Sequence, residues 1–174
     1  MIAALSRGAR VLQKPEYRDA AAGAADFILK NMRDAEGRLH HRYRDGDVAI
    51  TGHAEDYAYF IFGLLELYQA SFDPHYLKEA VGLQQHMLDD FWDDRKGGFY
   101  STTRHSRELP VRPKELYDGA LPSGNSVALL NFLYLSRLTG NPQWKEMAQA
   151  TTRAFSGSVH LHPAAFTFFL VGLD

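Results

Sequence analysis

Adjacent carboxylates at the expected start of an apolar helix are the first groups that could do chemistry. Glu55 and Asp56 stand there in "GHAEDYAYF". Free N–H groups at a helix start favour the ionised form, so the pair suits a base, a nucleophile or a sugar-hydroxyl acceptor. A glycosidase needs a second carboxyl group, and we predict Asp118 for it; a separation of about 5 to 5.5 Å would predict retention, and about 6.5 to 9.5 Å inversion. The alternative is that Glu55 and Asp56 only cap the helix.

Histidines supply the neutral-pH acid and base groups that an epimerase acting beside an anomeric carbon would need. In "LHHRYR", His41 and Tyr43 alternate with His40 and Arg42, so strand geometry sends the two pairs to opposite faces. We predict that His41 is catalytic and that Tyr43 and His53 contact substrate. A structural or surface role is the alternative for each.

Cationic and aromatic side chains could complete a sugar site. Arg42, Arg112 and Lys114 could bind the carboxylate of an acidic sugar or a phosphate, although solvated loop charges are the commoner explanation. Tyr57 could stack on a sugar ring, although an aromatic residue at helical spacing usually belongs to the core.

The stretch "LPSGNS" combines helix capping with a polar surface. Ser123 or Asn125 can satisfy the first amides of the following helix, and we also predict substrate contact for both. Ser123 lacks the flanking pattern and the histidine partner of a hydrolase nucleophile. There is no His-Glu-x-x-His pattern, and "HLH" at 160–162 is too weak a signal, so we predict no metal site and no cofactor.

Helix pairs must position these residues. Three segments share a proline followed two residues later by an aromatic residue: Pro15 and Tyr17, Pro74 and Tyr76, Pro142 and Trp144. Proline suits a first helical turn, and Asp73 and Asn141 precede their prolines as N-caps. Apolar runs over residues 2–12, 54–70 and 125–139 lie upstream. The pattern predicts three α-hairpins with buried first helices and half-exposed second helices, followed by a short helix over residues 163–172.

The connections between successive hairpins are long. The stretches "RDAEGRLHHRYRDGDVAITGH" and "DDRKGGFYSTTRHSRELPVRPKELYDGALPSG" contain glycines and alternate like short hairpin strands. Parallel inner helices begin at the same end, so we expect both loops and these helix starts to gather around one rim. Long loops on a rigid scaffold commonly carry function.

Composition limits the function classes. The 174 residues, 45% hydrophobic, predict a single domain, and a net charge of -2 without a basic stripe argues against nucleic acid. Charged or polar residues interrupt the longest apolar stretches short of the ~20 residues of a membrane span, so we expect no membrane association. The first residues do not resemble a signal peptide, and there is no cysteine, which excludes disulfides and thiol chemistry. We expect a cytoplasmic setting.

Several of these motifs together resemble a known family. The stretches "DYAYFIFGLLELYQASFD", "WDDRKGGFY" and "VRPKELYDGALPSGNSVALL" closely resemble the C-terminal helical region of the spermatogenesis-associated, thioredoxin-domain-containing proteins. The resemblance covers most of the chain. It implies an (α/α)6 toroid of the six-hairpin glycosidase type, related to N-acylglucosamine 2-epimerase and cellobiose 2-epimerase, and a carbohydrate-leaning site.

This chain departs from the family in three respects. It contains no thioredoxin-like domain and no Cys-x-x-Cys, so a redox role cannot reside in it. Glu55 precedes Asp56 where the family often has two aspartates. Three hairpins are expected where six close the toroid, so residues 1–174 would form a single partial toroid domain, either as a fragment or as one half of a homodimer.

Two functions follow as hypotheses. The leading one is a carbohydrate-active or carbohydrate-binding toroid domain, glycosidase-like or epimerase-like, acting on a small sugar. The alternative is a non-catalytic helical assembly module that completes its core by dimerisation or with a missing partner domain. The sequence leaves open whether the chain is an enzyme.

Overall fold

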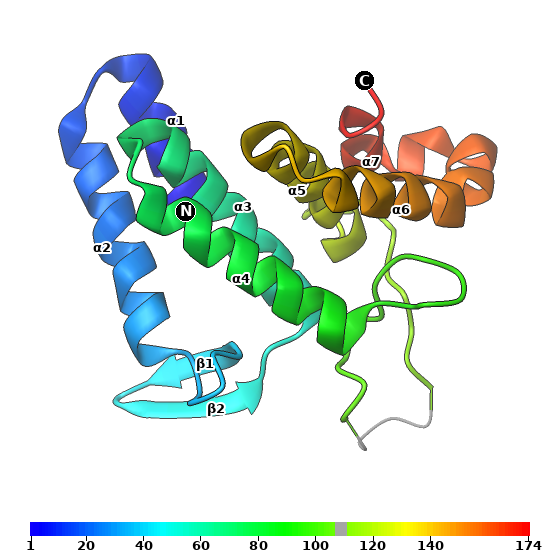
Figure 1. The fold of residues 1–174 in the computed structure, drawn as a ribbon, viewed down its shortest axis with the longest axis horizontal. Coiled ribbons are helices and arrows are strands. Elements are labelled where there is room, and N and C mark those ends of the chain that lie inside the picture. Colours follow the sequence, from blue (N-terminus) through cyan, green and yellow to red (C-terminus); the bar gives the residue numbers. More distant parts are fainter. Residues whose placement is uncertain (107–110) are drawn as a thin grey trace. The chain divides into compact units, whose positions relative to one another are not determined.

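The computed structural model describes residues 1–106 and 111–174 (Figure 1). Its helices are α1 (Ile2–Leu12), α2 (Pro15–Asn31), α3 (Ala54–Ser71), α4 (Pro74–Phe91), α5 (Gly124–Thr139), α6 (Pro142–Leu161) and α7 (Thr167–Val171). The strands are β1 (His40–Arg44) and β2 (Asp47–Thr51), and a 3-10 turn covers Pro163–Ala165. The chain divides into two compact units, residues 1–86 and 87–174. That the two units form a single domain stays a prediction.

The three predicted helix pairs are confirmed, as is the short C-terminal helix. Pro15, Pro74 and Pro142 are the first residues of α2, α4 and α6. Asn141 caps α6 by accepting the N–H of Gln143 at 3.0 Å. Local signals therefore place the helix starts, because proline at the first position and a polar cap satisfy the chain where intrahelical bonds are missing.

In the first unit, α1 packs on both α2 and α3. The pairs Ile2 with Gly63 and Arg7 with Glu66 show that α1 and α3 run parallel, as predicted for inner helices. A side chain at Gly63 would come within 3.3 Å of Ile2, so the glycine allows the helices to approach closely. Helix α3 is buried over most of its surface, as its apolar sequence predicts.

The first long connection forms the predicted β-hairpin. Strands β1 and β2 pair in antiparallel register through a two-residue turn at Asp45 and Gly46, which both have positive φ. Asp-Gly at such a turn matches the right-handed twist of the strands. The second connection differs, because its described residues contain no strand and make one isolated bridge, Trp92 with Phe99. Part of the strand-like stretch predicted there, residues 107–110, lies outside the described residues.

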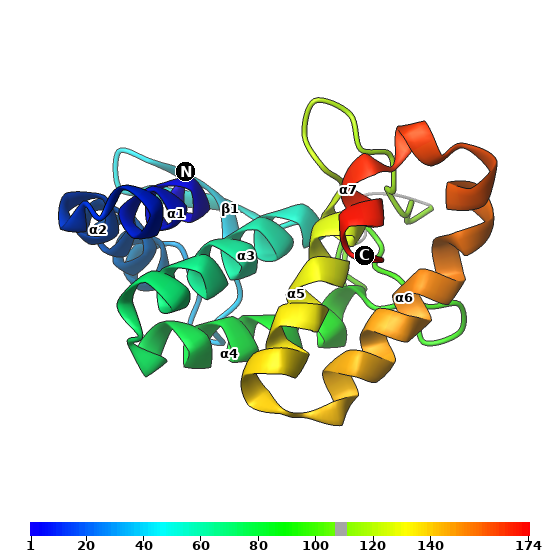
Figure 2. The same ribbon diagram turned by 90° about the horizontal axis from the view of Figure 1, so that it is seen from above.

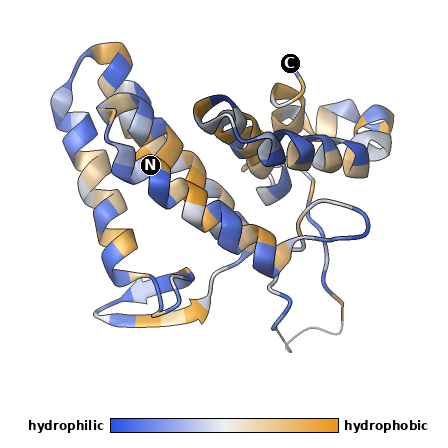
Figure 3. Ribbon diagram, in the orientation of Figure 1, coloured by the Kyte–Doolittle hydropathy of each residue, from blue (hydrophilic) through white to orange (hydrophobic). Residues whose placement is uncertain are grey.

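In the second unit, α5 packs against α6 and α7, and the α5–α6 hairpin is seen along its length in Figure 2. Phe132 of α5 stacks on Phe99 and on Trp144, with ring centroids 5.7 and 6.2 Å apart. Most residues of α5 are buried, whereas the ribbon of α6 mixes hydrophilic and hydrophobic residues in Figure 3. None of the helices in the described part of the chain has the length and apolar character of a membrane span.

Candidate functional site

A histidine and an aspartate from different elements meet in the first unit. His41 lies on β1, and its Nδ1 is 2.9 Å from Oδ2 and 3.1 Å from Oδ1 of Asp56, in the first turn of α3. The His41 side chain is 43% exposed and that of Asp56 25% exposed, so both reach solvent. The predicted catalytic residues His41 and Asp56 are therefore in contact.

His53 joins this pair from the end of the hairpin. Its backbone N–H donates to Asp56 Oδ2 at 2.8 Å, as one half of a capping box at the start of α3. Its ring lies edge-on to the ring of His41, with centroids 5.2 Å apart. Asp56 therefore caps the helix and also contacts a histidine.

The hairpin register explains why the histidines meet. Pairing of His40 with Thr51 returns the chain beside β1, and Gly52 donates its N–H to the carbonyl of Leu39 at 2.8 Å. A Cβ at Gly52 would lie 2.8 Å from that oxygen, so only glycine permits the approach that places His53 beside His41. Between the paired residues Ala49 and Thr51 lies Ile50, whose φ of 65° is unusual for a β-branched residue.

The other candidates of the first unit surround this cluster or support it. Glu55 is exposed. Arg42 pairs with Asp47 across the hairpin at 2.9 Å. Tyr43 packs edge-on against Phe27 of α2, and Tyr57 is buried. The Tyr57 hydroxyl accepts the N–H of Leu39 at 2.8 Å, so this tyrosine holds the segment that leads into β1.

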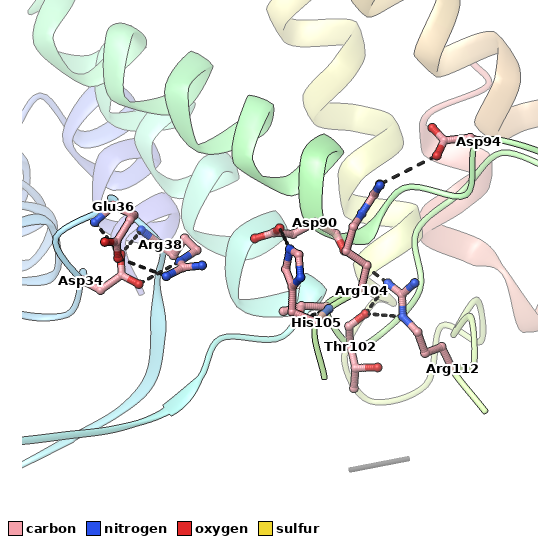
Figure 4. A network of polar contacts seen from close by, with 10 residues as sticks. Asp34, Glu36, Arg38, Asp90, Asp94, Thr102, Arg104, His105 and Arg112 are labelled. Atoms are coloured by element: carbon pink, nitrogen blue, oxygen red, sulfur yellow. Dashed lines mark hydrogen bonds and ion pairs between the residues drawn. The ribbon is translucent and has the colours of Figure 1, made fainter. Parts of the chain in front are cut away.

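In the second unit, Arg112 is bound to backbone oxygens (Figure 4). Its guanidinium donates to the Thr102 carbonyl at 2.6 and 3.0 Å and lies over the Tyr100 ring at 4.3 Å. Burial lowers the pKa of Arg112 from its usual value. Lys114 donates to Asp93 at 2.6 Å and to the Gly97 carbonyl at 2.5 Å. Both cations hold their loop together, and their contact with substrate stays a prediction.

Asp118 connects two parts of the second unit. Its Oδ1 accepts the N–H of Ser123 at 2.8 Å, and its Oδ2 accepts those of Phe168 and Phe169 at 2.8 and 3.0 Å. These bonds satisfy the buried carboxylate and the start of α7 together. They explain Asp118 structurally. A catalytic partnership with Asp56, which belongs to the other unit, stays a prediction.

The "LPSGNS" stretch caps α5 as predicted, and Ser123 is the cap. Its Oγ accepts the N–H of Ser126 at 3.1 Å. Asn125 is 3% exposed and bonds instead to the loop backbone at Phe99 and Glu115. Contact of Ser123 or Asn125 with substrate is untested by this arrangement.

Sequence reasoning missed that His41, His53 and Asp56 form a cluster. Each offers one ligand atom, and these atoms all lie within 4.8 Å of one another. The signal was present in the Asp-Gly turn, because a two-residue turn at 45–46 fixes the register and returns the chain to His53 beside His41. The spacing resembles no known metal motif, so motif inspection could not find it.

Comparison with known proteins gives a family and several relatives. Residues 59–165 match the model of the family described as glycosyl hydrolase family 47. The chain is also 36% identical over 155 residues to spermatogenesis-associated protein 20 of Mus musculus, a match that covers 83% of this chain and 20% of that protein. The chain thus spans about a fifth of the length of this relative.

Solved structures share the fold. The structure of cellobiose 2-epimerase from Spirochaeta thermophila matches with a TM-score of 0.72 and 22% identity, covering 88% of this chain and 40% of that one. D-Mannose isomerase matches with a TM-score of 0.75 and 18% identity, covering 88% and 40%. The predicted fold is confirmed as a partial α/α toroid related to those of glycosidases and sugar epimerases.

Proposed function

This chain belongs to glycosyl hydrolase family 47 and is homologous to spermatogenesis-associated protein 20, and from this premise we propose that it is a carbohydrate-active domain. The contact between His41 and Asp56 carries the proposal. It joins a titratable ring to an orienting carboxylate on a partly exposed surface, in a fold shared with a cellobiose epimerase and a mannose isomerase. The substrate is a small neutral or acidic sugar.

The hydrogen bond between His41 and Asp56 assigns a role to each nitrogen of the histidine ring. The Asp56 carboxylate accepts a hydrogen bond from Nδ1–H of His41, which leaves Nε2 of the same ring as the acceptor. A base held in this way takes a proton from a sugar hydroxyl, or from the carbon beside the carbonyl of an open-chain sugar. Because His53 donates its backbone N–H to Asp56, the carboxylate is fixed before substrate binds.

Neighbouring groups supply contacts for the sugar. Glu55 is exposed beside Asp56 and can accept hydroxyl hydrogen bonds, and Tyr43 is 38% exposed on the same strand as His41. Arg42 lies on the opposite face of the strand from His41 and pairs with Asp47 at 2.9 Å, so it is not used in this proposal. In this proposal the first unit holds the acid–base pair.

Calorimetric titration with a panel of neutral and acidic monosaccharides and disaccharides, in the presence of EDTA, tests sugar binding. We expect His41→Gln and Asp56→Asn to weaken binding at least tenfold, and His160→Gln, an exposed position on α6, to leave it unchanged. Incubating each bound sugar in D₂O and following its C2 proton by NMR tests proton transfer. Absence of binding across the panel, or equal binding by wild type and both site variants, contradicts the proposal.

A second candidate function is assembly. Val11 and Leu12 at the end of α1 and Phe72 after α3 are 79%, 58% and 78% exposed. Since α1 and α3 run parallel, these three apolar side chains lie at the same end of the first unit. Exposed apolar residues in a group favour burial against a second copy of the chain or a partner domain.

Light scattering over a range of protein concentrations tests assembly. A homodimer formed through this end should dissociate when Leu12→Lys and Phe72→Lys are combined, while Val48→Lys on β2 should not affect it. If the wild-type chain alone stays monomeric at all concentrations, self-assembly is excluded.

A further inference from the structure

We propose that His41, His53 and Asp56 bind a divalent first-row transition metal ion, with Zn²⁺ as the preferred ion. Two imidazole nitrogens and one carboxylate oxygen are a common protein ligand set for such ions, and water completes the coordination. The inference goes beyond the proposed function, because it concerns metal binding in the absence of any sugar.

The distances suit an ion between the three side chains. Asp56 Oδ2 lies 2.9 Å from His41 Nδ1 and 3.7 Å from His53 Nδ1. Ligands at ~2.0 to 2.1 Å from a tetrahedral zinc ion are roughly 3.3 Å from one another. All three ligand atoms lie within 4.8 Å of one another. Small rotations of the side chains would therefore bring them to coordination distance without moving the backbone.

The backbone pre-positions two of the three ligands. His53 and Asp56 are joined in the capping box, so their separation is fixed by the first turn of α3. The hairpin register then fixes His41 beside them. An outer contact that orients a ligand carboxylate typically strengthens a metal site. Here that contact is the His53 N–H bonded to Asp56 Oδ2 at 2.8 Å.

Charge and exposure also permit the ion. The positive end of α3 opposes a cation, but the Asp56 carboxylate at the same position offsets it, and Glu55 adds a second negative charge nearby. The side chains of His41, His53 and Asp56 are 43%, 39% and 25% exposed, so water can reach the ion and complete its shell. The nitrogen ligands favour Zn²⁺, Ni²⁺ or Co²⁺ over Mg²⁺ and Ca²⁺, which prefer oxygen.

Metal titration of the tag-free chain tests this site directly. Zn²⁺ is added to EDTA-stripped protein in a calorimeter, and Co²⁺ is added in parallel while its visible absorption reports nitrogen coordination. We expect one equivalent to bind. His41→Gln and His53→Gln should each weaken Zn²⁺ binding by at least tenfold, because loss of even an outer contact that orients a ligand costs about 10- to 100-fold.

His40→Gln is the matched control, because strand alternation puts His40 on the opposite face from its neighbour His41. It should bind Zn²⁺ as wild type does, and circular dichroism confirms that each variant is folded. Equal Zn²⁺ affinity in wild type and in His41→Gln or His53→Gln would overturn the site, as would the absence of bound Zn²⁺ at millimolar concentration. Sugar binding measured in EDTA is independent of either result, so the two proposals can fail separately.

Discussion

The side chain of Asn125 holds the backbone of Phe99 through both of its polar groups. Its Oδ1 accepts the Phe99 N–H at 2.7 Å, and its Nδ2 donates to the Phe99 carbonyl at 2.9 Å. Nδ2 also donates to the carbonyl of Glu115 at 2.7 Å. One amide at the start of α5 therefore holds the loop at Phe99, whose other strand-like contact is the isolated bridge to Trp92.

Removing that amide should destabilise the second unit. Asn125→Ala leaves the buried backbone N–H and carbonyl of Phe99 without their partner, and each unsatisfied group costs about 1 to 3 kcal/mol. We expect the free energy of unfolding to fall by about 3 kcal/mol in urea denaturation. Gln143→Ala, at an exposed position of α6, is the control and should change it little.

Asp118→Asn separates a structural role from a catalytic one. The amide keeps the shape of the side chain, but its NH2 group cannot accept a hydrogen bond, so either the bond from Ser123 or the bonds from Phe168 and Phe169 are lost. We expect a loss of about 1 to 3 kcal/mol in stability, because bonds to a charged acceptor are the stronger ones. A variant with unchanged thermal stability and lost sugar binding would instead support the catalytic prediction.

Glu66 is buried at 1% exposure between Arg7 and Arg10 of α1, which are 54% and 36% exposed. Removing both arginines leaves a buried carboxylate without a counter-ion, whereas removing Glu66 returns two arginines to water. The double variant Arg7→Ala, Arg10→Ala should therefore cost about 3 kcal/mol, more than Glu66→Gln. Thermal denaturation compares the stability of the two variants. A larger loss in Glu66→Gln would show that the buried carboxylate does not depend on the two arginines.

Asp93 should make the second unit sensitive to acid. The ammonium of Lys114, hydrogen-bonded to Asp93, holds the pKa of that carboxyl well below its usual range, and the N–H groups of Arg95 and Lys96 add to this. A lowered pKa contributes stability that is present above the unfolded-state pKa of about 3.9 and is lost as the pH falls through the folded value.

Thermal denaturation between pH 7 and pH 2 measures this contribution. Wild type should lose stability below about pH 4, and Asp93→Asn should be less stable at pH 7 but lose less on acidification. Lys114→Met should be less stable than wild type near neutral pH, and this difference should shrink as the pH falls. Parallel curves for wild type and Asp93→Asn would show that this carboxyl does not control the acid response.

The sequence by itself determined the helices and the first hairpin. Proline at a first helical position, Asn141 as a cap and the Asp-Gly turn act through adjacent residues, so their signals lie within a few positions. Apolar periodicity likewise indicated which helices are buried. The order and pairing of the elements followed from these local preferences.

Only the tertiary structure decided how the candidate residues are used. Asp118 bonds to Phe168, 50 residues further along the chain, and Asn125 bonds to Phe99 at a separation of 26. No local pattern encodes such contacts, because they depend on how helices and loops pack. The same packing brings Asp56, the cap residue of α3, into contact with His41. A hydrogen bond or a metal site requires particular distances and angles between atoms, and only the folded chain sets them.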